Sequence, residues 1–468
     1  MAAAGIISSQ RSSKREKPMY KKFVSASGTA YVFDSCTNNI YEIDDEEKFA
    51  SLPTVGDSSA LRLLDPEFFD SYYGKSYTDP TLMNEGVIAQ QAVPEVLVLE
   101  VTQQCNFRCE YCVFSGHYFN ERTHTDLWME LPVADRIIDT FFRGHEDSYP
   151  ANVSFYGGEP LTNFKVIQHV VDTLTNFHLN VEYYITTNGS LLLNQRIFDY
   201  LVAHQFHINI SYDGVNQDLY RKTINGEPTA STVEQVVSKL VNEYPDYSSS
   251  HIHLSITLAP PYHVQENYLY FKNHPVFSKI KVVINSLNTT DNDFVSQFDM
   301  AEESNQMSRD YHDLAEEYIR LSDTEASFFL HGLFTRSIGR IEDRCMGFRH
   351  TQARLGCCEP GQSRLFITCD GHYRMCERVG SFAPIGSIYK GFDLQAAQRV
   401  QQEFDAKILP ECHNCYLSSI CDFCYAAFHE GDSLISEAAR RQYCEHQRNW
   451  YDLVFYVFLS RSERKLTK

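Results

Sequence analysis

Hydrophobic and polar residues form two kinds of segment in the middle of the chain, from Val96 to about Leu321. Short apolar runs, typical of buried strands, are separated by longer stretches with apolar residues at helical spacing. The expected strands are Val96–Val101, Asn152–Phe155, Tyr183–Thr187, Ile208–Tyr212, His253–Leu258 and Lys281–Asn285. Leu131–Phe142 is expected to be a helix, with Pro132 in its first turn. This alternation predicts an α/β fold in which helices cover a parallel sheet, as a whole or partial barrel.

Weaker patterns flank this region on both sides. Thr29–Phe33 and Ile40–Ile43 are separated by turn-forming residues, which predicts a β-hairpin. Residues 57–84 are rich in Asp, Ser, Tyr and Pro and are interpreted as a linker. From Phe329 to Arg461 the periodicity is weak, but this region contains ten of the fourteen cysteines. We therefore expect bound metal to contribute to its folding.

Composition restricts the class of protein. The chain has 468 residues, 43% of them hydrophobic and 22% charged, which fits a globular protein of about two to four domains. Neither a signal peptide nor a membrane-spanning run is present, so a cytoplasmic protein without a membrane partner is expected. The formal net charge of −20 argues against nucleic acid as a partner. Only the first residues are basic, and residues 1–20 are interpreted as a flexible tail.

Three cysteines carry the most informative pattern in the chain. Cys105, Cys109 and Cys112 have C-x3-C-x2-C spacing on a loop directly after the strand predicted at Val96–Val101. A four-iron cluster held by three cysteines keeps one iron open to a small ligand, whereas structural zinc sites are closed by protein ligands. The alternatives are buried free thiols, or a zinc site that also uses His117 or His124. An open iron would indicate catalysis.

With Tyr111 before its last cysteine, this loop resembles the defining motif of radical SAM enzymes. That resemblance implies a partial (β/α)6 barrel and a [4Fe-4S] cluster whose open iron is chelated by S-adenosylmethionine. The family's Gly-Gly-Glu-Pro segment matches Gly157, Gly158 and Glu159, which would contact the amino group of the cofactor. By the same resemblance further cofactor contacts are expected from Tyr111, Asn188, Ser211 and Arg221. The simpler interpretation is that the Asn-Gly and Asp-Gly pairs only form turns.

The cysteines near the C-terminus resemble the SPASM extension of radical SAM peptide maturases, which holds two auxiliary [4Fe-4S] clusters. One cluster would take Cys358, Cys376 and Cys424, with Cys345 preferred over Cys357 and Cys369 as the fourth ligand. The other would take Cys412, Cys415, Cys421 and Cys444. The spacing between Cys421 and Cys424 is x2 where the family usually has x3. The alternative is a double zinc module, and Cys36 is expected to be an ordinary buried thiol.

The N-terminal hairpin resembles the small winged-helix-like domain with which many peptide-modifying enzymes bind a leader peptide as an added strand. A structural cap is the alternative. The predicted divisions are therefore a tail (1–20), a leader-recognition domain with linker (21–85), the radical SAM barrel (86–328), the SPASM domain (329–461) and a second tail (462–468).

The resemblance is strongest to maturases of Cys-rich peptides, of the sactipeptide and ranthipeptide classes. It implies a precursor peptide with a leader as substrate, thioether crosslinks as product, and flavodoxin or ferredoxin as electron donor. An anaerobic sulfatase maturase is the main alternative, but in those enzymes Asp follows the cysteine equivalent to Cys376, where this chain has Glu377. Glu377 is either a general base or a surface carboxylate. A non-catalytic peptide-binding scaffold stabilised by metal is the third possibility.

Overall fold

A computed structural model describes residues 19–64, 66, 94–118, 121–145, 148–287, 289, 292–344, 358–379, 383–412, 414–421, 424–428 and 435–466. Residues 1–18 of the predicted tail lie outside this range, whereas Met19 and Tyr20 belong to a strand. Most of the predicted linker, Cys345 and Cys357 also lie outside it.

Six parallel strands form the centre of the molecule, and all six predicted strands are confirmed. They are β5 (Val96–Thr102), β7 (Asn152–Gly157), β8 (Glu182–Thr187), β9 (His207–Ser211), β11 (Ile252–Leu258) and β12 (Lys281–Ser286). Their spatial order follows their order in the chain, from β5 at one side to β12 at the other. The carboxyl ends of all six strands therefore meet at one rim.

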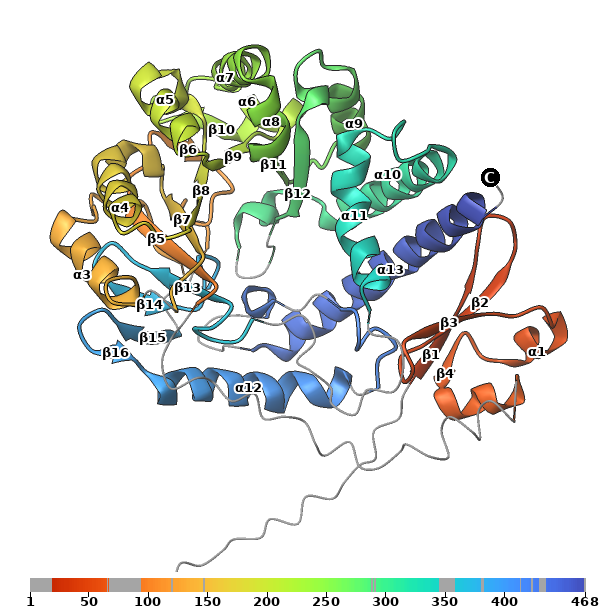
Figure 1. Cartoon of the computed structure of the whole chain (residues 1–468). Coiled ribbons are helices and arrows are strands. Elements are labelled where there is room, and N and C mark those ends of the chain that lie inside the picture. Colours follow the sequence, from red (N-terminus) through yellow and green to blue (C-terminus); the bar gives the residue numbers. More distant parts are fainter. Residues whose placement is uncertain are drawn as a thin grey trace, which may run out of the picture.

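Helices cover the outer face of this curved sheet (Figure 1). The predicted helix is α3 (Leu131–Phe141), which has Pro132 in its first turn and buries Ile137, Ile138 and Phe141. The other helices of this part are α4 (Phe164–Asn176), α5 (Gln195–Ala203), α6 (Gln217–Tyr220), α7 (Ala230–Glu243), α8 (Pro245–His251), α9 (Val264–Asn273), α10 (Met300–Arg320) and α11 (Phe328–Glu342). Because α11 packs on β12, the barrel extends beyond the boundary predicted at residue 328.

Single 3-10 turns follow several strands and helices. They are η2 (Pro160–Asn163), η3 (Ser190–Leu193), η4 (Gly214–Asn216), η5 (Phe277–Lys279), η6 (Phe294–Gln297) and η7 (Tyr425–Ala427).

The C-terminal region continues the same sheet. Strand β13 (Arg364–Ile367) pairs in parallel with β5, and β14 (His372–Arg374), β15 (Pro384–Ser387) and β16 (Gly391–Phe392) follow antiparallel, which gives ten strands. Two long helices complete the region, α12 (Leu394–Cys412) and α13 (Glu437–Leu466). The tail predicted from residue 462 is wrong as far as Leu466, because α13 continues to that residue.

Apolar burial in the C-terminal region is larger than its sequence pattern suggests. Leu365, Ile385, Phe404 and Val457 are buried in the same hydrophobic core as the barrel. The apolar residues of this region therefore belong to the main core.

The N-terminal segment forms a four-stranded antiparallel sheet in the order β3-β2-β1-β4. The predicted hairpin is confirmed as β2 (Ala30–Asp34) and β3 (Asn39–Glu42). Sequence reasoning missed β1 (Met19–Val24) and β4 (Val55–Asp57). The helix α1 (Glu46–Ser51) follows the hairpin, and η1 (Ser58–Leu63) occupies the start of the predicted linker.

This N-terminal sheet packs on α13 and on the cysteine-rich loop before it. The rings of Phe23 and Phe455 are stacked with centroids 4.3 Å apart. Lys21 forms an ion pair with Asp452 and donates to the hydroxyl of Tyr416 at 3.3 Å. Tyr416 directly follows Cys415, so the sheet contacts one of the predicted auxiliary-cluster motifs. Figure 1 shows the sheet beside α13, away from the barrel strands.

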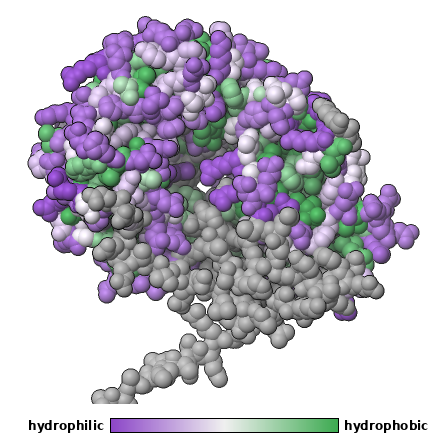
Figure 2. Space-filling model, viewed as in Figure 1, coloured by the Kyte–Doolittle hydropathy of each residue, from purple (hydrophilic) through white to green (hydrophobic). Residues whose placement is uncertain are grey.

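The space-filling view shows a mainly hydrophilic outer surface and a recess near the middle of the face within the ring of helices (Figure 2). No helix in the described ranges is both long enough and apolar enough to cross a bilayer.

Candidate active site

The loop with the three cysteines follows β5 at the rim of the barrel and is held by a small ladder of its own. Strand β6 (Phe107–Cys109) pairs antiparallel with β10 (Arg221–Thr223), and Arg221 lies opposite Cys109 in this pairing. The loop that follows β9 therefore fixes the backbone of the cysteine loop, and it places a cation beside the thiols.

The three cysteines are half-buried. Burial and, to a smaller extent, the nearby Glu159 carboxylate raise the pKa of Cys105 to about 12. Burial also raises the pKa of Cys109 to about 12, although Arg221 opposes this rise. Backbone N–H groups point at two of the sulfur atoms, from Phe107 to Cys105 Sγ at 3.4 Å and from Phe114 to Cys112 Sγ at 3.5 Å. Such donors would stabilise thiolates once a metal displaces the protons.

A buried network surrounds Tyr111. Its hydroxyl donates to Asp213 and accepts from Arg221 Nη1, the latter at 3.0 Å. Burial works against the charged guanidinium, but the neighbouring Cys109, Tyr111 and Asp213 outweigh this effect and raise the pKa of Arg221. The Nε atom of Arg221 is buried and has no hydrogen-bond partner among the described residues. This N–H is therefore available to an acceptor at the cysteine loop.

The Gly-Gly-Glu segment lies against the cysteine loop through its backbone. The N–H of Gly158 donates to Thr102 O at 2.9 Å, and that of Glu159 donates to Gln104 O at 2.8 Å. A Cβ atom on Gly157 would approach Thr102 O to 2.1 Å, and one on Gly158 would approach Gln104 O to 2.0 Å. The two glycines are thus required for close packing against the loop, whereas the sequence suggested only approach to a ligand.

The Glu159 carboxylate is fully buried and ties β7 to the end of β8. Its Oε1 accepts from Thr187 Oγ1 at 2.8 Å and from the N–H of Leu161 at 3.1 Å, and Oε2 accepts from the N–H of Asn188 at 2.7 Å. Burial raises the pKa of Glu159 to about 7, and these hydrogen bonds limit the rise. Both carboxylate oxygens already accept from the protein.

The remaining predicted contacts come from the next strand ends. Asn188 Nδ2 donates to Asn106 Oδ1 at 2.8 Å and lies 4.0 Å from Cys105 Sγ. Ser211 is the last residue of β9, two positions before Asp213. The sequence interpretation treated Asp213 as part of a turn and missed its contacts with Tyr111 and with the N–H of Thr257. Its place at a strand end beside a buried arginine could have identified it.

Replacing Gly158 with Ala should disrupt the cysteine loop, because the added Cβ would overlap the Gln104 carbonyl. Overpacking of this kind costs about 1 to 3 kcal/mol, and we expect lower iron content after anaerobic reconstitution. Iron and protein assays measure the effect. Gly339→Ala in α11 is the matched control, because no atom lies within 4 Å of the added Cβ. Equal iron content in the two variants would contradict the packing argument.

Mutual effects on pKa link two sets of the described C-terminal cysteines. Burial raises the pKa of Cys376, and Glu377, Cys424 and Cys358 add to this rise, so the three thiols lie near one another. Burial raises the pKa of Cys412 in the same way, with Cys415 and Cys444 as the largest neighbouring contributions. Cys421 is buried at the end of the segment that begins beside Cys415.

Cys369 lies apart from both groups. Its N–H donates to Glu100 Oε2 at 3.2 Å, and its thiol lies 4.0 Å from the carbonyl oxygen of Leu127. Burial and the Glu100 carboxylate raise its pKa, and no cysteine is among the groups that shift it. Cys36 lies half-buried in the turn between β2 and β3, although we expected it to be buried.

Glu377 is partly neutralised by a cation. Its Oε1 accepts from Arg364 Nη1 at 2.5 Å, and its Oε2 is buried without a hydrogen-bond partner in the described structure. It is therefore not a surface carboxylate.

Within the described ranges, no three His, Cys, Asp or Glu side chains are close enough to hold one metal ion together. A four-iron cluster does not need such a group, because each of its cysteines binds a different iron.

The sheet and this loop lie in a region that matches a known domain family. Residues 99–259, from β5 to just past β11, match the family model of the radical SAM superfamily. The match covers the cysteine loop, the Gly-Gly-Glu segment and the network around Arg221.

Two curated relatives each match about a third of the chain. The radical SAM cyclopropyl synthase TigE of Paramaledivibacter caminithermalis is 26% identical over 168 residues, 33% of this chain and 35% of that protein. The cysteine-type anaerobic sulfatase-maturating enzyme of Clostridium novyi is 25% identical over 155 residues, 32% of this chain and 40% of that protein. The chain thus spans less than half the length of these relatives.

A solved structure, native anSMEcpe with bound AdoMet, is similar over 78% of this chain and 98% of that chain, with a TM-score of 0.57 and 18% identity. At this identity the similarity concerns the fold.

A radical SAM domain implies a four-iron cluster and S-adenosylmethionine, and the loop fits both. Cys105, Cys109 and Cys112 would hold the cluster, because they are three half-buried cysteines on one short loop with N–H donors at two sulfurs. The unpartnered Nε of Arg221 would suit the carboxylate of S-adenosylmethionine.

Proposed function

We propose that this protein is a radical SAM enzyme that forms thioether crosslinks in a ribosomally made, Cys-rich precursor peptide. The observation that carries the proposal is the attachment of a cysteine-rich region to the barrel. Strand β13 extends the sheet beside β5, with Cys358 shortly before it in the chain and the other cysteines of the two groups after it.

The bound cofactors would supply a 5′-deoxyadenosyl radical that removes hydrogen from a substrate carbon. Arg221 and Tyr111 would orient the amino acid part of S-adenosylmethionine, with Gly157, Gly158, Glu159, Asn188 and Ser211 around it. Thioether formation also requires the loss of a thiol proton, and Oε2 of Glu377 is our proposed acceptor because it is buried and unpartnered in the described structure.

The two C-terminal cysteine groups would each hold an auxiliary [4Fe-4S] cluster. Auxiliary clusters would supply an electron acceptor for a reaction that removes two electrons from the peptide overall. The groups are Cys358, Cys376 and Cys424, with Cys345 as fourth ligand, and Cys412, Cys415, Cys421 and Cys444. A reduced flavodoxin or ferredoxin would supply electrons to the radical SAM cluster.

The N-terminal sheet is our candidate for leader binding. Strand β3 is an outer strand of this sheet, and an extended peptide can add to such a strand through main-chain hydrogen bonds. Its packing against α13 and Tyr416 would place a bound leader beside the cysteine-rich region.

Co-expression with a Cys-rich peptide encoded beside the gene tests the function. Each crosslink should lower the peptide mass by that of two hydrogen atoms and remove one thiol from alkylation. The same peptide with Cys replaced by Ala is the control. An unchanged peptide mass, together with active cleavage of S-adenosylmethionine, would reject thioether synthesis.

An anaerobic sulfatase-type maturase is the second candidate, favoured by the relative from Clostridium novyi. That function predicts loss of sulfur from a sulfatase-derived peptide and a product that reacts with aldehyde probes. Thioether formation gives neither result.

A further inference from the structure

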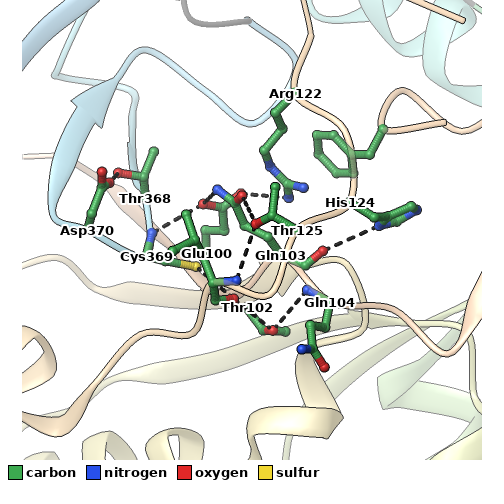
Figure 3. Close-up of polar contacts among 12 residues, drawn as sticks. Glu100, Thr102, Gln103, Gln104, Arg122, His124, Thr125, Thr368, Cys369 and Asp370 are labelled. Carbon is green, nitrogen blue, oxygen red and sulfur yellow. Dashed lines mark hydrogen bonds and ion pairs between the residues drawn. The ribbon is translucent and has the colours of Figure 1, made fainter. Parts of the chain in front are cut away.

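A buried carboxylate lies just before the cysteine loop. Glu100, near the end of β5, is fully buried, and its Oε2 accepts from Gln103 Nε2 at 3.0 Å. The same oxygen accepts from the N–H of Cys369 at 3.2 Å, in the turn between β13 and β14. Figure 3 shows Glu100 between these residues and Arg122. One side chain therefore joins the start of the cysteine loop to the C-terminal region.

Arg122, which follows the loop, is the cation that faces this carboxylate. Its Nη2 lies 2.6 Å from Glu100 Oε1, and only 12% of its side chain is exposed. Neither atom forms an aligned hydrogen bond, so the contact is mainly one of charge. Arg122 Nη1 is also buried and has no hydrogen-bond partner among the described residues.

The guanidinium of Arg122 reaches the cysteine loop through Phe114. It lies 3.4 Å from the centroid of the Phe114 ring, and the N–H of Phe114 points at Cys112 Sγ. Arg122 is therefore held beside the part of the loop whose backbone donates toward Cys112 Sγ.

Burying an ion pair of this kind reduces the stability of the fold. Moving both charges out of water costs several kcal/mol each, and apolar residues of the same size often stabilise a fold as well or better. The charges of this pair are felt over a longer range than at a surface, because the interior screens them weakly. The position of the pair, between the cysteine loop and β13, points to a role at the loop.

We propose that the Glu100–Arg122 pair positions the second half of the cysteine loop and sets the reduction potential of the cluster that Cys112 would hold. Nearby charge and hydrogen bonds tune the potential of iron–sulfur clusters. Arg122 favours the reduced, more negative cluster, and Glu100 opposes it. The inference rests on a cluster at this loop and does not depend on the peptide substrate.

Variants that remove the charge of Glu100, of Arg122 or of both test the proposal. The full chain is used, with its cluster reconstituted anaerobically. Glu100→Gln should raise the ratio of reduced to oxidised cluster at a fixed potential about tenfold. For a one-electron couple this corresponds to a rise in the reduction potential of about 59 mV. Arg122→Gln should lower it by a similar factor, and the double variant should return to within about threefold of the parent. The readout is a redox titration of the electron paramagnetic resonance signal that changes when S-adenosylmethionine is added.

Equal potentials in all variants, or shifts of one sign in both single variants, would overturn the proposal. Arg122→Lys keeps the charge and should stay near the parent potential even if packing suffers. If Arg122→Lys and Arg122→Gln shift the potential equally, charge is not the cause. Altered potentials without any peptide modification would leave this inference intact and reject only the proposed function.

Discussion

Replacing Cys105, Cys109 and Cys112 together with Ala should reduce cleavage of S-adenosylmethionine to background. All three cysteines are half-buried on one loop held by β6 and β10, and no other described cysteine lies on that loop. Without them the cluster has no ligands from the barrel. The measurement is 5′-deoxyadenosine, quantified chromatographically after chemical reduction of the anaerobic protein.

Cys36→Ala is the matched control for this prediction, because Cys36 lies in the N-terminal sheet, away from the barrel strands. It should retain full cleavage. Production of 5′-deoxyadenosine by the triple variant at the rate of the parent would remove the loop from the mechanism.

Replacing Arg221 with Met should have the second-largest effect, on both stability and cofactor binding. The Tyr111 hydroxyl links Arg221 to the buried Asp213 carboxylate, so the substitution removes a cation near this carboxylate and the donor to the hydroxyl, which costs about 1 to 3 kcal/mol. It also removes the free Nε–H at the cysteine loop. Loss of one charge-assisted hydrogen bond should weaken binding of S-adenosylmethionine about 10- to 150-fold.

Denaturant unfolding and equilibrium binding measure these two effects separately. The double variant Arg221→Met/Asp213→Asn should recover part of the stability, because no buried charge is then uncompensated, but it should not recover binding. Additive losses of stability in the double variant would show that the two side chains are not coupled.

The barrel could be predicted because its strands and helices have clear apolar periodicities. Strand β1 could not, since Met19–Val24 carries two adjacent lysines, one of which is paired with Asp452 far along the chain. The helices α12 and α13 were missed for a related reason. Their buried residues face surfaces supplied by the barrel and the N-terminal sheet, so no narrow apolar stripe marks them in the sequence.

The spacing of the cysteines is enough to predict the cysteine loop, but it does not identify the side chains that hold the loop in place. Tyr111 was predicted as a cofactor contact, whereas its described partners are Asp213 and Arg221. Glu100 was missed although the sequence contains a signal for it. A lone carboxylate within the apolar run Val-Leu-Val-Leu-Glu-Val is costly to bury, so it requires a partner, and nothing in the sequence identifies Arg122 as that partner.

The parallel pairing of β13 with β5 has a consequence for how the protein is made in the cell. Chains fold from the N-terminus during synthesis. Of the two strands that pair with β5, β7 is translated early, but β13 is translated only after almost all of the barrel. Until β13 emerges from the ribosome, β5 has an exposed edge, and Glu100 lacks its Cys369 donor. The sheet around the cysteine loop is therefore complete only after the C-terminal region has been synthesised.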